Sequence, residues 1–174
     1  MLFKEGDFIF YGSGGICRVE NVCEMPFEGA REGVPYYILH TLSEPKQVIM
    51  NPTDNDKVLM RAVMTEDEAK SMLASLPFAE PFDAPNAKAL REKYITAIKS
   101  AIPSEWARVL VTYESRRRKS EAKLARVTEA ERGFYNQALA LLAAELALVT
   151  GTAPIDATAK IADIVKNDRN FCKK

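Results

Sequence analysis

The residues that most suggest chemistry are the three glycines of the stretch GSGG, which spans residues 12–15. Glycine-rich turns can cradle a phosphate, because their backbone N–H groups are accessible to it. The phosphate-binding pattern GxxxxGK[ST] and the dinucleotide-binding pattern GxGxxG both lead into a helix, whose N-terminus holds the anion. Here the strand-like run ICRVENV follows the glycines instead. We therefore expect these glycines to supply positive φ angles in a tight turn between two strands, and an enzyme that binds a small molecule through this turn is the least favoured alternative.

Other residue types that are common in catalytic and metal sites are few, or they lie where structural roles are expected. The chain has one histidine and three cysteines, and no two cysteines form a CxxC pair. These counts argue against a zinc site, a histidine-based triad and a disulfide framework. Acidic pairs such as Asp54 and Asp56 fall in a predicted turn, and residues 66–68 fall in the first turn of a predicted helix. We predict no enzymatic activity, no catalytic residue, no metal and no cofactor.

The composition is that of an ordinary globular protein, since 47% of the 174 residues are hydrophobic and 28% are charged. No apolar run approaches the roughly 20 residues of a membrane span. The first residues, MLFKEGDF, lack the long apolar region of a signal peptide. We therefore expect a cytoplasmic protein without a membrane partner. The charges are unevenly distributed, because residues 1–64 hold 6 Lys/Arg and 9 Asp/Glu and the rest of the chain is net basic.

The first 60 or so residues are typical of short strands separated by Gly, Pro, Asn and Asp. The runs PYYILHTL and KQVIM are examples, and NPTDND has the composition of a turn. Five strands in so short a segment are too few for a large sandwich. We predict a small SH3-like or Tudor-like β-barrel over residues 1–63, because closure of a barrel removes exposed edges.

From residue 65 onward the pattern becomes helical. Thr65 with Glu68, and Thr128 with Glu131, form capping boxes, and Gly151 stands where a helix should end. Pro103 stands at the start of another helix. About five helices are predicted in residues 64–174, so the fold class is α+β, with a β-barrel followed by an all-α domain.

The strongest charge feature is the run from Arg116 to Lys119, inside a segment from Arg108 to Arg132 with 8 Lys/Arg and 4 Asp/Glu. Two interpretations stay open: contacts to nucleic-acid phosphates, or basic residues that suit the end of a helix. Trp106 is the one tryptophan, and its spacing from Val109, Leu110 and Tyr113 favours a place in the core.

Four segments, in order along the chain, resemble the CarD/CdnL family of bacterial transcription regulators. They are MLFKEGDFIFYGSGGICRVENV, MNPTDNDKVLMR, REKYITAIKS and TEAERGFYNQALALLAAELAL. The first module is also similar to the polymerase-interacting domain of transcription-repair coupling factors. The resemblance implies a Tudor-like module that binds the β subunit of RNA polymerase and a helical domain that contacts promoter DNA near the upstream edge of the transcription bubble, modulating open-complex stability.

The resemblance also implies site residues. In this family a tryptophan wedges into the minor groove, and matching the family's helix to Tyr94 puts Leu90 at that position. Glu92 stands where the family has a basic residue, and Leu59 stands where glycine is usual. The expected polymerase contacts are Met25, Lys46, Gln47, Val48, Ile49 and Met50. The expected DNA contacts are Lys88, Leu90, Arg91, Lys93, Arg116, Arg117, Arg118, Lys123 and Arg132.

The predicted function is therefore a polymerase-binding regulator, expected to be a monomer, whose DNA contacts are weak and largely independent of sequence. It would reach the nucleoid through the polymerase. The main alternative is an adaptor that keeps the polymerase contact and has lost the DNA wedge, as Leu90 and Glu92 suggest.

Overall fold

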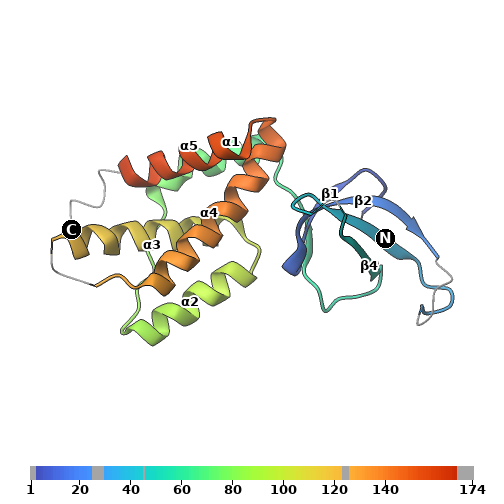
Figure 1. Cartoon of the computed structure of the whole chain (residues 1–174), viewed down its shortest axis with the longest axis horizontal. Coiled ribbons are helices and arrows are strands. Elements are labelled where there is room, and N and C mark those ends of the chain that lie inside the picture. Colours follow the sequence, from blue (N-terminus) through green and yellow to red (C-terminus); the bar gives the residue numbers. More distant parts are fainter. Residues whose placement is uncertain (1–2, 25–29, 45, 123–125, 168–174) are drawn as a thin grey trace. The chain divides into compact units, whose positions relative to one another are not determined.

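The computed structural model describes residues 3–24, 30–44, 46–122 and 126–167. They form two compact units, Met1–Val63 and Met64–Lys174 (Figure 1). The first unit is an antiparallel sheet and the second is a group of α-helices. The predicted α+β class, with the β part first, is confirmed.

The sheet of the first unit has five strands in the order β4-β3-β2-β1-β5, so β4 and β5 are its edges. Every pair of neighbours is antiparallel. The strands are β1 (Phe8–Tyr11), β2 (Gly15–Cys23), β3 (Tyr36–Thr41), β4 (Val48–Pro52) and β5 (Met60–Ala62). This order, a meander that returns to place its last strand beside the first, suits a small barrel.

Asn51 shows that the sheet curls toward closure. It lies on β4, yet its Oδ1 accepts a hydrogen bond of 3.4 Å from the Tyr11 hydroxyl on β1. Its Nδ2 lies 3.8 Å from Sδ of Met60 on β5. Residues on both edges and on β1 thus meet around one core, which is centred on Ile9, Cys17, Val19, Tyr37 and Leu39.

The glycine turn between β1 and β2 is the short 3-10 helix η1, Gly12–Gly14. Gly12 and Gly15 have φ angles of 23° and 70°, as predicted. A Cβ atom on Gly14 would lie 2.9 Å from Cδ1 of Ile49. The space beside Gly14 is therefore occupied by a side chain from β4. The turn also leads into a strand, so it lacks the helix N-terminus of a phosphate-binding loop.

The second unit contains α1 (Glu66–Ser75), α2 (Ala87–Lys99), α3 (Pro103–Glu121), α4 (Glu129–Thr150) and α5 (Pro154–Asn167), with a 3-10 helix, η2 (Leu76–Phe78), after α1. Both predicted capping boxes are present at Thr65 and Thr128. Gly151 ends α4 with a φ angle of 63°. The ends of these helices are therefore set by short-range sequence signals.

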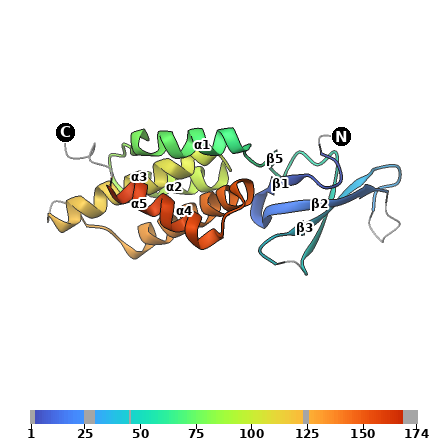
Figure 2. The same ribbon diagram turned by 90° about the horizontal axis from the view of Figure 1, so that it is seen from above.

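Helix α4 is the centre of this unit, because it packs against α1, α2, α3 and α5 (Figures 1 and 2). By length and composition it is the one described helix that could cross a membrane. However, it buries Glu145 completely and forms the core with Trp106, Leu110 and Ile161 of its neighbours. Part of its apolar surface, including Tyr135, Leu142 and Leu146, is therefore buried by packing within this unit.

Candidate protein and nucleic-acid interaction surfaces

The outer edge of β4 carries backbone groups that no described strand pairs. The N–H of Thr41 bonds to the carbonyl of Gln47 at 3.5 Å, and Leu39 lies opposite Ile49 in the register. In an antiparallel pair, alternate residues exchange hydrogen bonds with the neighbour and the others turn away from it. Val48 and Met50 therefore direct their N–H and C=O groups toward the open edge.

The side chains of β4 alternate in the same register. Val48 and Met50 are 44% and 46% exposed, whereas Ile49 packs against the core of the sheet. Lys46 and Gln47, just before the strand, are exposed. Open backbone groups and exposed apolar side chains thus occur at the same two residues, which is the arrangement that strand addition needs. Met25, also expected at this surface, lies outside the described residues.

The three arginines of the basic run in α3 are engaged within the helical unit. Arg116 donates from Nε to Oε1 of Glu131 at 2.6 Å and from a terminal nitrogen to the carbonyl of Arg126 at 3.1 Å. Arg117 donates to Oε2 of Glu114 at 2.8 Å, and this hydrogen bond raises the pKa of Arg117. Glu114 is 1% exposed, so its charge needs a partner.

Arg118 and Arg132 also have partners. Arg118 donates to the carbonyls of Val165 and Lys166 at 3.2 and 2.5 Å, where α5 leaves carbonyls without helical partners. Arg132 pairs with Glu129, one turn earlier in α4. Three residues of the run from Arg116 to Lys119, namely Arg116, Arg117 and Arg118, therefore have partners within the fold, which favours the structural interpretation for these three. Lys123, the other expected basic contact in this region, lies outside the described residues.

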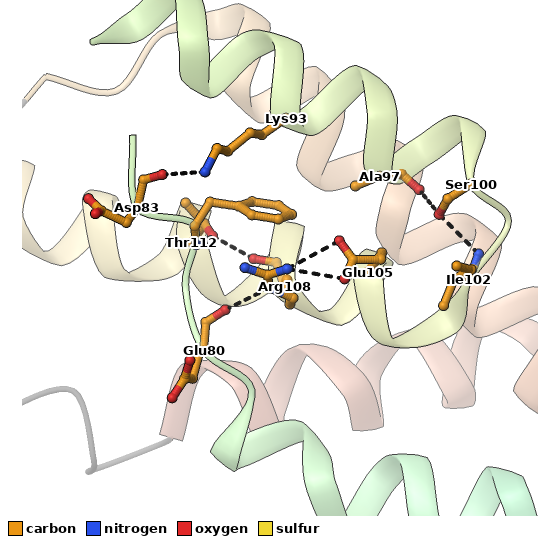
Figure 3. Close-up of polar contacts among 10 residues, drawn as sticks. Glu80, Asp83, Lys93, Ala97, Ser100, Ile102, Glu105, Arg108 and Thr112 are labelled. Carbon is orange, nitrogen blue, oxygen red and sulfur yellow. Dashed lines mark hydrogen bonds and ion pairs between the residues drawn. The ribbon is translucent and has the colours of Figure 1, made fainter. Parts of the chain in front are cut away.

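Helix α2 carries two of the expected DNA contacts whose charges are not engaged by described residues. Lys88 and Arg91 are exposed, and neither has a hydrogen-bond or ion-pair partner in the described part of the chain. Lys93 donates to the carbonyl of Asp83 at 2.6 Å (Figure 3). Among the expected DNA contacts that the structure describes, Lys88 and Arg91 are thus basic residues whose charges are available to a phosphate.

Leu90, the expected wedge, is buried with 5% exposure on the inner face of α2, one turn before the fully buried Tyr94. A side chain that packs in the core cannot insert between bases without opening the bundle, so the wedge expectation for Leu90 is corrected. Trp106 is 0% exposed, and its Nε1 lies 3.4 Å from the carbonyl of Ile98. Its predicted core role is confirmed.

Residues 3–64 match the family model of the CarD-like/TRCF RID domain. The N-terminal unit therefore belongs to this domain family, as its sequence resemblance predicted. It is thereby identified as an RNA polymerase-interacting domain. The match ends at the start of the helical unit, whose resemblance to the CarD/CdnL family stays a prediction. No curated protein matches the chain.

The helical unit also has a feature that its sequence did not suggest: the segment between η2 and α2 is hydrogen-bonded to α3. The N–H of Phe82 donates to the Thr112 hydroxyl at 2.8 Å. Arg108 donates to the carbonyl of Glu80 at 3.2 Å (Figure 3). Its guanidinium lies 4.3 Å from the Phe82 ring centre. The prolines of this segment predicted a break between helices, but nothing local predicts these partners.

Burial raises the pKa of two side chains, Cys17 and Tyr135, above their usual ranges. Burial raises the pKa of Cys17, in the RID domain, to about 11, which keeps its thiol protonated and poorly nucleophilic. In the helical unit, burial first and Glu114 second raise the pKa of Tyr135 to about 12. Within residues 3–24, 30–44, 46–122 and 126–167, no group of three or more His, Cys, Asp and Glu side chains is placed to hold a metal.

Proposed function

We propose that this protein is a transcription regulator that binds the β subunit of RNA polymerase through the open edge of β4 and contacts promoter DNA near the upstream edge of the bubble through its helical unit. The observation that carries the proposal is the coincidence of open backbone groups and exposed apolar side chains at Val48 and Met50, on a domain of the RID family. The RID match supports the polymerase, and the resemblance of the whole chain supports the β subunit and the DNA.

In this proposal a strand of the β subunit pairs with β4. Main-chain hydrogen bonds at Val48 and Met50 supply affinity, and their side chains supply specificity through apolar contact. In the CarD/CdnL family an arginine can project from this strand, whereas the present chain has Gln47 and Ile49 there. Contact at this edge would accordingly depend more on apolar burial than on ion pairs, and salt should weaken it little.

Binding to polymerase would then hold the helical unit close to promoter DNA. At a high effective concentration, a few weak phosphate contacts are sufficient. Lys88 and Arg91, which are exposed and have no partner among the described residues, are our first candidates for these contacts. DNA binding by the protein alone should be weak, and its affinity should fall steeply as salt rises.

The test is a pull-down of the β-subunit fragment by the full chain and by Val48→Asp and Met50→Asp. An aspartate at the open edge places a charge in an apolar interface, so we expect at least a tenfold loss of binding for each, which corresponds to about 1.4 kcal/mol. The matched control is Asn21→Asp, which adds the same charge at an exposed position of β2, a central strand. Retained binding in both edge variants, with the fold intact by circular dichroism, would move the interface elsewhere.

The burial of Leu90 favours a second candidate, an adaptor that binds polymerase without inserting a side chain into DNA. Footprinting of a polymerase–promoter complex, with and without the protein, separates the two. A regulator of the first kind changes protection at the upstream edge of the bubble, whereas an adaptor leaves it unchanged.

A further inference from the structure

Three consecutive backbone N–H groups at the junction of the two units are each bonded to a different element. The N–H of Val63 bonds to the carbonyl of Phe8 on β1 at 3.4 Å. The N–H of Met64 bonds to Oε1 of Glu145 on α4 at 2.7 Å, and the N–H of Thr65 bonds to Oε2 of Glu68 on α1 at 2.7 Å. The peptide plane before Val63 is therefore held by the RID domain, and the plane after it is held by the helical unit.

This arrangement leaves little chain between the two attachments. Each peptide group is planar, so the two planes that flank Val63 are joined only through its φ and ψ angles. Valine is β-branched, which further favours extended backbone at this position. A linker of several unattached residues, the usual connection between domains, is not what this junction contains.

Glu145 is the residue that attaches the backbone of Met64 to the helical unit. It lies on α4, far along the chain from Met64, and it is 0% exposed. The hydrogen bond from the N–H of Met64 to Glu145 therefore ties the backbone of Met64 to the helical unit. Burying a carboxyl group is costly unless it is hydrogen-bonded, and the Met64 N–H supplies one of its bonds.

We propose that Glu145 is a positioning residue that confines movement between the RID domain and the helical unit to a single hinge, the φ and ψ angles of Val63. Without Glu145 the backbone of Met64 would be released, and the number of free dihedral angles between the units would double. The hinge is a property of the free protein. Its consequence for transcription, a restricted range of DNA positions that the helical unit can reach from polymerase, rests on the proposed function.

The test measures the distance between spin labels at Glu20→Cys on β2 and Lys160→Cys on α5, both exposed positions. The full chain carries Cys23→Ser and Cys172→Ser, and the buried Cys17 is left in place. Pulsed electron paramagnetic resonance gives the width of the distance distribution. We expect Val63→Gly and Glu145→Ala each to widen it about twofold, because glycine reaches backbone conformations closed to valine and alanine removes the acceptor. Glu145→Gln keeps a carbonyl acceptor and should retain the original width.

The matched control is Glu114→Ala. Glu114 is the other glutamate of the helical unit with 1% exposure or less, and its partner is Arg117 rather than the junction. The Glu114→Ala variant should lower the unfolding temperature without widening the distance distribution. This result would separate a positioning role of Glu145 from a general loss of stability. An unchanged width in Glu145→Ala, or equal widening in Glu114→Ala, would overturn the proposal. If Glu145→Ala does not fold, the test rests on Val63→Gly. An unchanged width of the distance distribution in Val63→Gly would also overturn the proposal. Polymerase binding by the β4 edge is measured separately, so failure of one proposal leaves the other standing.

Discussion

Arg116 distinguishes a residue that supports the fold from one that contacts DNA. Its replacement by glutamine removes the 2.6 Å bond to Glu131 and the 3.1 Å bond to the carbonyl of Arg126. The side chains of Arg116 and Glu131 are 32% and 11% exposed. Glu131 also accepts from the N–H of Thr128 at 2.8 Å, as part of the capping box of α4. The substitution therefore acts on the contact between α3 and the start of α4.

The expected magnitude follows from this partial burial. Exposed ion pairs contribute about 0.2–1 kcal/mol, and hydrogen bonds to charged groups contribute about 1.5–3 kcal/mol. The pair is partly screened, but removal of the arginine leaves the more buried Glu131 without its cation. We therefore expect Arg116→Gln to lower the free energy of unfolding by about 2 kcal/mol, with the salt dependence of DNA binding unchanged.

The assay has two readouts. Urea unfolding, followed by the fluorescence of Trp106, gives stability, and fluorescence anisotropy of labelled DNA over a series of salt concentrations gives the number of phosphate contacts. The matched control is Arg91→Gln, which removes the same charge from an exposed side chain without a described partner. It should leave stability within about 0.5 kcal/mol of the original and reduce the salt slope by about 1. Unchanged stability in Arg116→Gln, together with a reduced salt slope, would refute the assignment of Arg116 to the fold.

Three further predictions concern stability, measured by urea or heat unfolding. Gly14→Ala should destabilise the RID domain by about 1–3 kcal/mol, because its Cβ would lie 2.9 Å from Ile49, whereas Gly133→Ala in α4 meets no atom within 4 Å and should stabilise by about 0.5–1 kcal/mol. Trp106→Ala should cost about 3–5 kcal/mol, because the whole side chain is buried. The free energy of unfolding should fall as pH rises from 10 to about 12, because the Tyr135 hydroxyl ionises more readily in the unfolded chain than in the folded one. Tyr135→Phe should reduce this fall. A variant whose stability depends on pH in the same way as the original protein would contradict the prediction.

Features that depend on neighbouring residues were predictable from the sequence. The helix starts at Thr65 and Thr128, the end of α4 at Gly151 and the glycine turn all depend on groups within a few residues of one another. The match of residues 3–64 to the RID family likewise follows from an ordered pattern in the chain. The hydrogen bonds of caps and turns join residues within four or five positions of each other, so a short sequence pattern is enough to predict them.

The faces that these elements bury were decided only by tertiary structure. Arg116 bonds to Glu131, which is 15 residues later in the chain. Arg118 bonds to the carbonyl of Val165, 47 residues later, and the N–H of Met64 bonds to Glu145, 81 residues later. Leu90 faces the core rather than solvent because α2 packs against α3 and α4. An amphipathic pattern shows that a helix has an apolar face. It does not show which basic side chains stay exposed, because that depends on partners that are distant in the chain. For this reason the sequence determined the elements and the family of the first domain. The fold decided that Arg116, Arg117 and Arg118 have partners, whereas Lys88 and Arg91 have none among the described residues.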